Sequence, residues 1–381
     1  MPKYIYHNRQ KGRTIIMKDT ENTNAPDVSV VVLIYNGAWE RVRATLNSIV
    51  SQKGINFDVI IIDDCSEVKF FDKIKDFFLR HDFTDYRLTA HTENLGIIKT
   101  YLEAAQAART EYMRVLEQGD MFFDEYALRD SYNYAVRTDA EVLITQAVFY
   151  RAFSNPVELI AHRRYPQNIR AYDNPDDLKE SYLLRNDNIS GASVLYRCDV
   201  FIQYMKEAVD EGIKYLEDFM IKCMIFDERR IRFLERNAIY YEFGAGISTV
   251  QGNDTPFRTQ EMYDAMQLDQ IRTDEMLLRR CMNYPSEFSE KLAALINTKK
   301  ARRKRKKEIE KEIEYRQKLK DKLGIISVPV ILARRLTGFI KRKLRHEKNV
   351  KSEVFVDKIQ TNILTDTDVS TKFANFCMNR E

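Results

Sequence analysis

The chain has few of the residues on which thiol and imidazole chemistry depend. It contains five cysteines and five histidines among 381 residues. No two cysteines form a C-x-x-C pair, and no histidine neighbours them at metal-ligand spacing, which argues against a zinc site and for a reducing compartment. No Ser-His-Asp or Cys-His set is apparent, because the histidines are isolated. The cysteines are Cys65, Cys198, Cys223, Cys281 and Cys377, and the histidines are His7, His81, His91, His162 and His346.

Long apolar runs and glycine-rich phosphate loops are also missing. Nowhere do about 18 apolar residues follow one another, so no membrane-spanning helix is expected. The N-terminal residues 1–19 carry positive charge but no apolar core of a signal peptide, so a cytoplasmic location is expected. The sequence holds no Walker-type loop, and phosphates would therefore be held by a metal ion rather than by a cradle of glycines.

Charge of one sign is concentrated near the C-terminus. The formal net charge is +4, yet residues 299–348 hold 20 Lys and Arg against 6 Asp and Glu, a balance of +14. The remainder must then carry about −10. An acidic body with a basic tail is informative about partners rather than about fold.

Strands and helices alternate along the first third of the chain. β-Branched apolar runs predict strands at 28–35, 57–63, 86–91 and 112–116, and helical spacing predicts intervening helices at 39–51, 68–80 and 97–109. Such βαβ units predict an α/β fold with a mostly parallel, Rossmann-like sheet and right-handed crossovers.

The alternation becomes less regular after residue 140. A strand is predicted at 141–150, an irregular loop at 153–180, a strand at 194–196 and a late strand at 238–243. Helices are predicted at 124–137, at 199–208, from 216–219 onward, and from 257 to 323 with a break at Pro285. We therefore divide the chain into a lead-in (1–27), a catalytic domain (28–250), a helical continuation (251–297), basic and amphipathic helices (298–348) and a polar tail (349–381).

Two adjacent acids, Asp63 and Asp64, follow the apolar run of the second predicted strand. Ligands of open α/β sheets bind at the carboxyl ends of the strands. This placement predicts a nucleotide or sugar site around Asp64, and a strand that ends in a solvated Asp-Asp turn is the alternative.

The order of short motifs resembles the inverting family 2 glycosyltransferases, which have the GT-A fold. VSVVVLIYN (28–36) is similar to that family's first strand, with Leu33 where the family mostly has proline. The remaining similar segments are VIIIDDCS (59–66), ENLG (93–96), LEQGD (116–120), LED (216–218) and GIS (246–248). No single motif is specific, but six in this order over roughly residues 28–250 are specific together.

The resemblance implies roles for residues at the matching positions. Tyr35 would lie against the donor base and Asp64 would accept its imide N–H. Asp120, with Glu117, would bind a divalent metal, Mg²⁺ or Mn²⁺, at the diphosphate. Asp218 would be the general base beside Glu217. Further donor-binding residues would be Asn36, Asp63, Asn94, Gly96, Lys99 and Gly191.

Other readings of these residues remain open. The family motif normally has aspartates where this chain has Glu117 and Gly119, which weakens metal ligation as an inference. Asp120 can instead be the N-cap of the helix predicted at 124–137. The acids at 217–218 can complement a helix dipole, Gly191 can serve a plain turn, and Lys99 can be solvated.

The basic run KKARRKRKK (299–307) and the amphipathic segment 325–345 are typical of a helix on an anionic membrane surface. A solvated helix, or one that packs on the catalytic domain or on a second subunit, is the alternative. Nucleic-acid binding is disfavoured, because the basic run has no interleaved aromatics and no reader motif.

Together these features predict a metal-dependent inverting glycosyltransferase on the inner face of the cell membrane. It would transfer a sugar from a nucleotide-diphosphate donor, expected to be a UDP-sugar, to a glycan acceptor, expected to be lipid-linked, in capsule or other surface polysaccharide synthesis. A catalytically weakened scaffold for an active transferase is one alternative. A nucleotidyltransferase is another, but it leaves the pair at 217–218 without a task.

Overall fold

The computed structural model describes residues 25–151, 158–160, 166, 168–185, 187, 189–243, 256–297 and 300–323. Most of the predicted lead-in, the motif at 246–248, the segment 325–345 and the tail 349–381 lie outside the described residues. No described helix is both long enough and apolar enough to cross a membrane.

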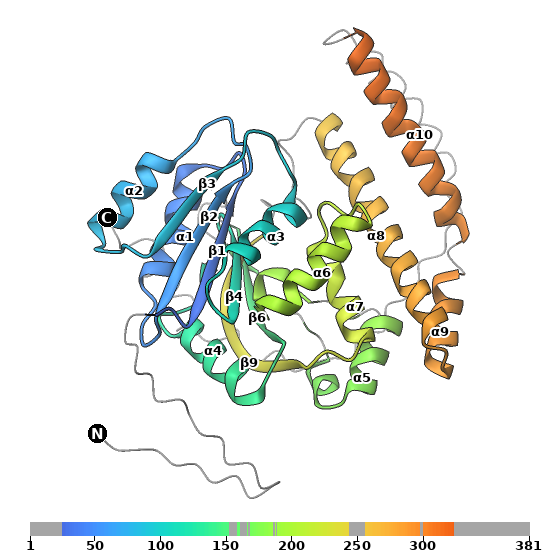
Figure 1. The fold of residues 1–381 in the computed structure, drawn as a ribbon, viewed down its shortest axis with the longest axis horizontal. Coiled ribbons are helices and arrows are strands. Elements are labelled where there is room, and N and C mark those ends of the chain that lie inside the picture. The colour runs from blue at the N-terminus through green and yellow to red at the C-terminus, as the bar shows by residue number, and fades with distance from the viewer. Residues whose placement is uncertain are drawn as a thin grey trace, which may run out of the picture.

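The described residues fold into one nine-stranded sheet with helices on both faces (Figure 1). The strands are β1 (Val28–Ile34), β2 (Phe57–Asp63), β3 (Tyr86–Ala90), β4 (Tyr112–Glu117), β5 (Met121–Phe122), β6 (Val142–Arg151), β7 (Glu158–Ile160), β8 (Val194–Arg197) and β9 (Ile231–Glu242). The longer helices are α1 (Trp39–Val50), α2 (Phe71–Arg80), α3 (Ile97–Ala107), α4 (Ala127–Thr138), α6 (Cys198–Asp210), α7 (Met220–Phe226), α8 (Pro256–Asn283), α9 (Glu287–Asn297) and α10 (Lys300–Leu323). This confirms the predicted α/β class with C-terminal helices.

The strand order is β3-β2-β1-β4-β8-β6-β9-β5, with β7 paired to β6. The β3-β2-β1-β4 unit is parallel throughout, and β6 and β9 are also parallel. The antiparallel pairings are short, at two or three residue pairs each. The sheet is thus mixed but mostly parallel, as the alternation of strands and helices predicts.

Alternate residues of the parallel strands point into two separate cores. In β1, Val30 and Val32 pack with helices α1, α2 and α4, whereas Val31 and Leu33 pack with α3, α6 and α7. Strands buried on both faces read as continuous apolar runs, which is why VSVVVLI and VIII carry no alternation. The two helical layers hold the carboxyl ends of β1, β2 and β4 at one edge.

Several predicted elements differ from the observed ones in their bounds or type. Helix α2 begins at Phe71 rather than at residue 68, and β9 begins at Ile231, seven residues before the predicted start. The polar residues in the first half of β9 hid that strand, and its pairing with β6 is interrupted by register shifts. The acids at 217–218 lie in a short 3-10 turn, η4 (Glu217–Phe219), ahead of α7.

The segment predicted as an irregular loop at 153–180 contains regular structure. It holds β7, a 3-10 turn η1 (Ile169–Asp173) and helix α5 (Pro175–Lys179), which a π-helical turn η2 (Glu180–Leu184) continues. The Asn174 side chain accepts a hydrogen bond from Asp176 N, and Pro175 occupies the first helical position. An Asn N-cap followed by proline is a helix start, so the sequence did contain the signal.

Helix α8 supports the segment that precedes the acids at 217–218. Asp269 of α8 is buried, and its Oδ2 accepts hydrogen bonds from Lys214 N at 3.2 Å and Tyr215 N at 2.8 Å. The Lys214 carbonyl oxygen accepts one from Ile98 N at 3.3 Å, in the first turn of α3. Residues 214–215 are therefore held from both sides.

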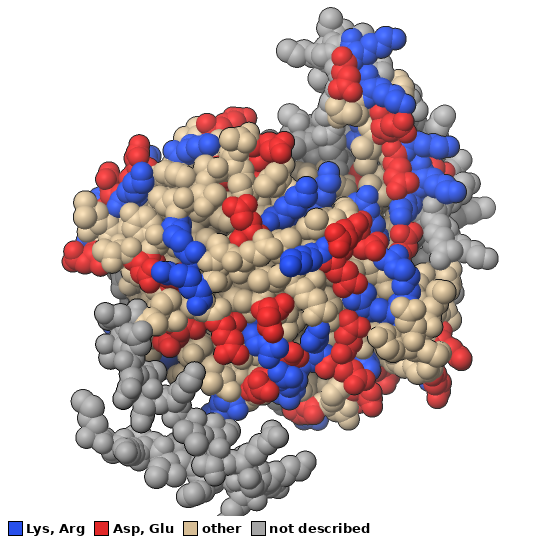
Figure 2. Space-filling view, viewed as in Figure 1, with Lys and Arg blue, Asp and Glu red and all other residues tan. Residues whose placement is uncertain are grey.

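Helix α10 packs along α8 (Figure 1). Arg316 is almost fully buried there, and its Nη2 lies 2.6 Å from Asp264 Oδ2. Lys306 Nζ lies 2.7 Å from Glu275 Oε2. The space-filling view shows both signs of charge interspersed along the visible part of α10 (Figure 2). Part of the basic region therefore packs on the rest of the protein through α8. This resembles the alternative in which the basic helix packs on the protein rather than on a membrane.

Candidate functional site

The carboxyl edge of β1, β2 and β4 brings three predicted motifs together. Asn36 N donates to Ser66 Oγ at 2.9 Å, and Glu67 N donates to Asn36 Oδ1 at 2.9 Å. Gln118 Nε2 donates to the carbonyl oxygen of Tyr35 at 2.9 Å. The loops after the three strands are therefore joined, and the Tyr35 ring remains partly exposed on this edge.

Asp63 and Asp64 have different surroundings. Asp63 is fully buried, its Oδ1 accepts from Ser66 N at 2.7 Å, and its Oδ2 has no hydrogen-bond partner among the described residues. Asp64 accepts from Leu95 N at 2.8 Å and from Gly96 N at 2.9 Å. The solvated Asp-Asp turn is thereby ruled out as a description of this pair.

The loop at 94–96 is fastened to Asp64 and opens helix α3. Gly96 has a φ of 83°, which disfavours any residue with a Cβ. A Cβ there would also lie 3.3 Å from the carbonyl oxygen of Lys214. Asn94 and Lys99 are exposed on either side of it. Of the predicted donor-binding residues of this loop, Gly96 contacts Asp64 directly through its backbone N–H.

The turn at 117–120 is held by helix α1. Gly119 N donates to Thr45 Oγ1 at 2.9 Å, and Arg41 Nη2 donates to the carbonyl oxygen of Gln118 at 3.0 Å. Asp120 Oδ1 accepts from Glu242 N at 3.0 Å, and its Oδ2 has no hydrogen-bond partner among the described residues. Because α4 begins at Ala127 after Tyr126, Asp120 is not its N-cap.

Gly191 and the acids at 217–218 lie against each other. A Cβ on Gly191 would sit 2.8 Å from Glu217 Oε1 and 3.5 Å from Asp218 Cβ. A side chain at 191 would therefore displace the carboxylate end of Glu217, and Gly191 opens the 3-10 turn η3 (Gly191–Ser193). The structure thus joins two motifs that lie 26 residues apart in the sequence.

Burial makes this edge an acidic cluster that resists ionisation. Desolvation raises the pKa of Glu117, an effect that Arg41 opposes and Asp218 reinforces. Desolvation and the charge of Glu117 raise the pKa of Asp120 well above its usual value. Burial raises the pKa of Asp218 to about 6 despite the opposing charge of Lys222.

Glu217 shows the same trend, because burial, Asp218 and Glu117 together raise its pKa well above its usual value. Glu117 and the pair at 217–218 are therefore close enough for their charges to influence one another. Perturbed carboxyl groups grouped at a sheet edge are typical of functional sites.

The acidic cluster has the donor chemistry of a divalent cation site. Mg²⁺ is commonly held by one or two carboxylates together with substrate phosphates. The unpartnered Oδ2 of Asp120 and the carboxylate of Glu117 meet that requirement. Within the described residues, no group of three or more His, Cys, Asp or Glu side chains has the geometry of a metal site by protein ligands alone. The residues therefore fit a cation that substrate phosphates help to hold.

Sequence reasoning missed three residues of this edge. Glu242, at the end of β9, pairs with Arg41 of α1 at 2.6 Å between Oε2 and Nε. Its Oε1 has no hydrogen-bond partner among the described residues. His91 binds Asp64. Arg41 and His91 belong to no sequence motif. Glu242 could have been found only from its position at the end of a late strand.

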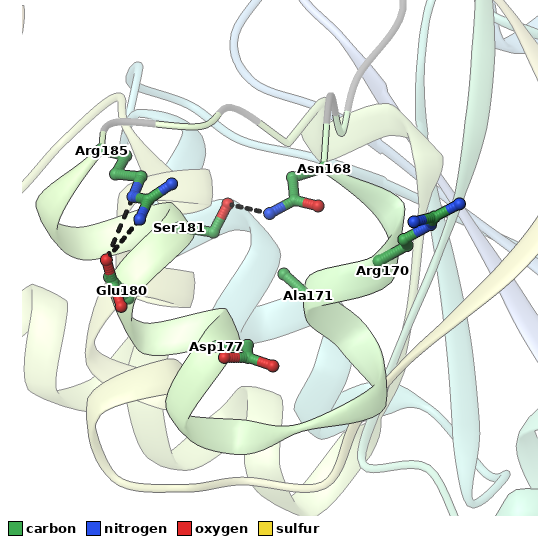
Figure 3. A pocket seen from close by; sticks show the side chains of 7 residues that line it. All are labelled: Asn168, Arg170, Ala171, Asp177, Glu180, Ser181 and Arg185. Atoms are coloured by element: carbon green, nitrogen blue, oxygen red, sulfur yellow. Dashed lines mark hydrogen bonds and ion pairs between the residues drawn. The ribbon is translucent and has the colours of Figure 1, made fainter. Parts of the chain in front are cut away.

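A small polar cavity lies away from these strand ends, between η1, α5 and η2 (Figure 3). Its volume is about 140 Å³, which is below the roughly 300–1,000 Å³ usual for small-molecule sites. Among its lining side chains, Arg185 pairs with Glu180 and Asn168 Nδ2 donates to Ser181 Oγ at 3.2 Å. The cavity is therefore too small for a nucleotide sugar.

Residues 29–212 match the protein family described as glycosyl transferase family 2. These residues form a glycosyl transferase family 2 domain. The matched segment contains the predicted donor and metal residues, from Tyr35 to Gly191, and ends five residues before Glu217. The family 2 match thus confirms the resemblance. The predicted base, Asp218, lies outside the matched segment.

No curated protein matches the chain. Solved structures similar to it include two of S. aureus TarS 1-349. The one in complex with UDP-GlcNAc is 17% identical, with 71% of each chain covered and a TM-score of 0.47. The other is 15% identical, covering 76% of this chain and 91% of that chain, with a TM-score of 0.45. We draw no functional conclusion from likeness at this level.

Proposed function

We propose that the protein is an inverting glycosyltransferase that moves a sugar from a nucleotide-diphosphate donor, taken to be a UDP-sugar, to a glycan acceptor. The family 2 domain supports the reaction class. The observation that carries the proposal is the buried Oδ2 of Asp120, which has no hydrogen-bond partner among the described residues and lies in the turn that follows β4 at the carboxyl edge of the sheet. It supports a cation site for the leaving diphosphate, and the charges of Glu117 and Asp218 influence one another beside it.

In this reaction the acceptor hydroxyl oxygen attacks the anomeric carbon while the bond to the diphosphate breaks, and the configuration inverts. Asp218 would take the proton of the acceptor hydroxyl. A pKa of about 6 suits this role, because the carboxylate is then ionised at neutral pH yet more basic than an ordinary aspartate. Glu217 would face the acceptor.

Asp120 and Glu117 would hold Mg²⁺ or Mn²⁺ at the diphosphate. The cation would neutralise the negative charge that develops on the leaving diphosphate. The buried Oδ2 of Asp120 supports this assignment, because it lacks a hydrogen-bond partner among the described residues. Unpaired buried carboxylate oxygens are costly unless a ligand satisfies them.

Tyr35 and Asp64 would bind the nucleoside from the ends of β1 and β2. The exposed Tyr35 ring can cover the base, while Asp64 retains one lone-pair site after its three hydrogen bonds. Asn36, Asp63, Asn94, Gly96 and Gly191 would shape the donor site around them. Lys99, exposed in the first turn of α3, would face the phosphates.

The acceptor would be a glycan, and a lipid-linked glycan in surface polysaccharide synthesis such as a capsule would explain the basic C-terminal region. The excess of positive charge at 299–345 favours an anionic membrane surface on the cytoplasmic side. Packing of α10 against α8 also leaves room for contacts within a homo-oligomer.

The proposal is tested by calorimetric titration of UDP with and without Mn²⁺. Wild type should bind UDP only when the metal is present, and Asp120→Asn should lose this metal-dependent binding. Glu235 is an exposed residue of β9, so Glu235→Gln is the control and should bind UDP as wild type does. Donor hydrolysis that requires the metal would then exclude the scaffold alternative. If UDP binds under neither condition and no donor is hydrolysed, a scaffold with a degraded 117–120 turn becomes the better account.

A further inference from the structure

His91 lies between two carboxylates at the donor edge of the sheet. It follows β3, and its side chain is 8% exposed. Nδ1 lies 2.8 Å from Asp64 Oδ1, and Nε2 lies 2.9 Å from Glu103 Oε2. Its backbone N–H also donates to the carbonyl oxygen of Asp63 at 2.9 Å. Both ring nitrogens therefore face carboxylate oxygens.

Only the imidazolium form can satisfy this arrangement. A neutral imidazole has one N–H donor, whereas the protonated ring has two. The charged groups that face the ring are Asp64, from the end of β2, and Glu103, from α3. Burial lowers the pKa of His91, but the hydrogen bonds and charges of these two carboxylates outweigh burial and raise the pKa above its usual value.

His91 contacts Asp64, which links the end of β2 to the start of α3. Asp64 also accepts the backbone N–H groups of Leu95 and Gly96, where α3 begins. Glu103 lies farther along the same helix. The imidazolium thus fastens the end of β2 to α3 at two places, one through Asp64 and one through Glu103.

We propose that His91 is a positioning residue for donor binding. As an imidazolium it holds Asp64 and the first turn of α3 in the geometry that receives the nucleoside, and donor affinity falls when it loses its proton. This role rests on the proposed function, because it assumes that the nucleotide binds beside Asp64.

The direction of the pH effect follows from the contacts. When the ring loses its proton, one carboxylate faces a lone pair instead of an N–H. Glu103 is 44% exposed on its side chain and can turn to water, whereas Asp64 is buried and keeps the remaining N–H. The second tie to α3 and the positive charge beside Asp64 are then lost. Affinity should therefore be highest below the pKa of His91 and fall above it.

The test is calorimetric titration of UDP with Mg²⁺ from about pH 5.5 to about pH 8.5, around the range in which histidine titrates. The variants are His91→Gln, Glu103→Gln and, as a matched control, His81→Gln. His81 is exposed at the end of α2, where its Nδ1 lies 2.8 Å from the carbonyl oxygen of Phe77 and its ring stacks on that of Phe77. The terminal phosphate of UDP also titrates in this range, so each variant is compared with wild type at the same pH.

We expect the dissociation constant of wild type and of His81→Gln to rise by up to about tenfold between the limits, the equivalent of one pKa unit. Glu103→Gln removes a carboxylate that raises the pKa of His91, so its affinity should begin to fall at lower pH. His91→Gln should bind UDP more weakly and keep only the pH dependence that comes from UDP and from the acids of the proposed metal site.

A purely structural role would weaken binding in His91→Gln without moving the pH profile of Glu103→Gln, and that result would overturn the proposal. Binding of UDP by wild type with the same pH profile as His91→Gln would also overturn it, while leaving the proposed function intact. Absence of UDP binding by wild type at every pH would overturn the proposed uridine donor and this role together.

Discussion

Glu242 Oε2 occupies the space beside the α-carbon of Gly119, only 1.8 Å from where a Cβ at that position would lie. Gly119 stands where the family motif has an acid, and a carboxylate from β9 lies there instead. Its partner Arg41 also binds the carbonyl oxygen of Gln118, so the carboxylate cannot easily move aside. The turn at 117–120 is therefore built around a glycine.

An aspartate at position 119, where the family motif has one, should destabilise the fold of this protein. Gly119→Asp would collide with Glu242 and would hold an aspartate at a φ of 102°, so the free energy of unfolding should fall by roughly 1–3 kcal/mol. Urea denaturation measures this. Adding Glu242→Ala should recover only the part due to the collision, and a Gly119→Asp protein as stable as wild type would contradict the geometry.

Removing the proposed base should separate chemistry from donor binding. Asp218→Asn should reduce transfer by at least about 100-fold, the usual contribution of a general base, while UDP binding changes little. Turnover is measured by release of UDP from the donor with acceptor present. Undiminished turnover would remove Asp218 as the base.

The same substitution should stabilise the fold. Burial raises the pKa of Asp218 to about 6, so the folded state binds more protons than the unfolded state between about pH 4 and pH 6. Stability is therefore lost as the pH rises through this window, and the loss is complete above it. At pH 7 Asp218→Asn should raise the free energy of unfolding by roughly 1–3 kcal/mol, and at pH 4 the two proteins should be equal.

The pH dependence of sugar transfer should show the titration of Asp218. Because Asp218 must be ionised to accept a proton, kcat/KM should decline tenfold per pH unit below about pH 6, the pKa raised by its burial. A pH-rate profile with saturating metal measures this limb. An acidic limb centred near pH 4 would show that another carboxylate accepts the proton.

Arg41 should be important for stability beyond its single ion pair. Arg41→Ala leaves the carboxylate of Glu242 buried without its partner, and breaking a buried pair on one side typically costs about 3–5 kcal/mol. Since Arg41 is partly exposed, we expect the lower end of that range. Arg43→Ala, an exposed residue of the same helix, is the control and should change the free energy of unfolding little.

Truncation after residue 297 tests the role of the basic region. The shortened protein should stay folded and bind UDP as before, but it should no longer sediment with anionic vesicles. Loss of α10 also removes the partner of Asp264, so a modest fall in thermal stability is expected. Sedimentation of the truncated protein would place the membrane contact elsewhere.

The sequence was sufficient for the elements that depend on short-range patterns. The strands β1, β2 and β4 are mainly apolar, and the loops that follow them carry acids and turn residues whose convergence at one edge follows from parallel order. The contact between Gly191 and Glu217 could not be predicted, because it depends on tertiary packing. The ion pair of Arg41 with Glu242 likewise depends on the packing of α1 against β5 and on the pairing of β5 with β9.

His91 illustrates a different limit. In the sequence it is one of five isolated histidines, and its interest arises from two carboxylates supplied by separate elements. The beginning of β9 was missed for a related reason, since its polar residues pair with β6 across irregular register and show no alternation.

The hydrogen bonds from residues 214 and 215 to Asp269 mean that the proposed catalytic residues depend on a helix outside the matched family 2 segment. The matched family 2 segment ends at Gly212, yet the backbone that leads to Asp218 is anchored by a carboxylate on α8. Exchanging the C-terminal helices between related enzymes would therefore move the proposed base, even if every residue of the proposed donor site were kept. For this chain, the smallest unit that can be transplanted with its chemistry intact extends at least through α8.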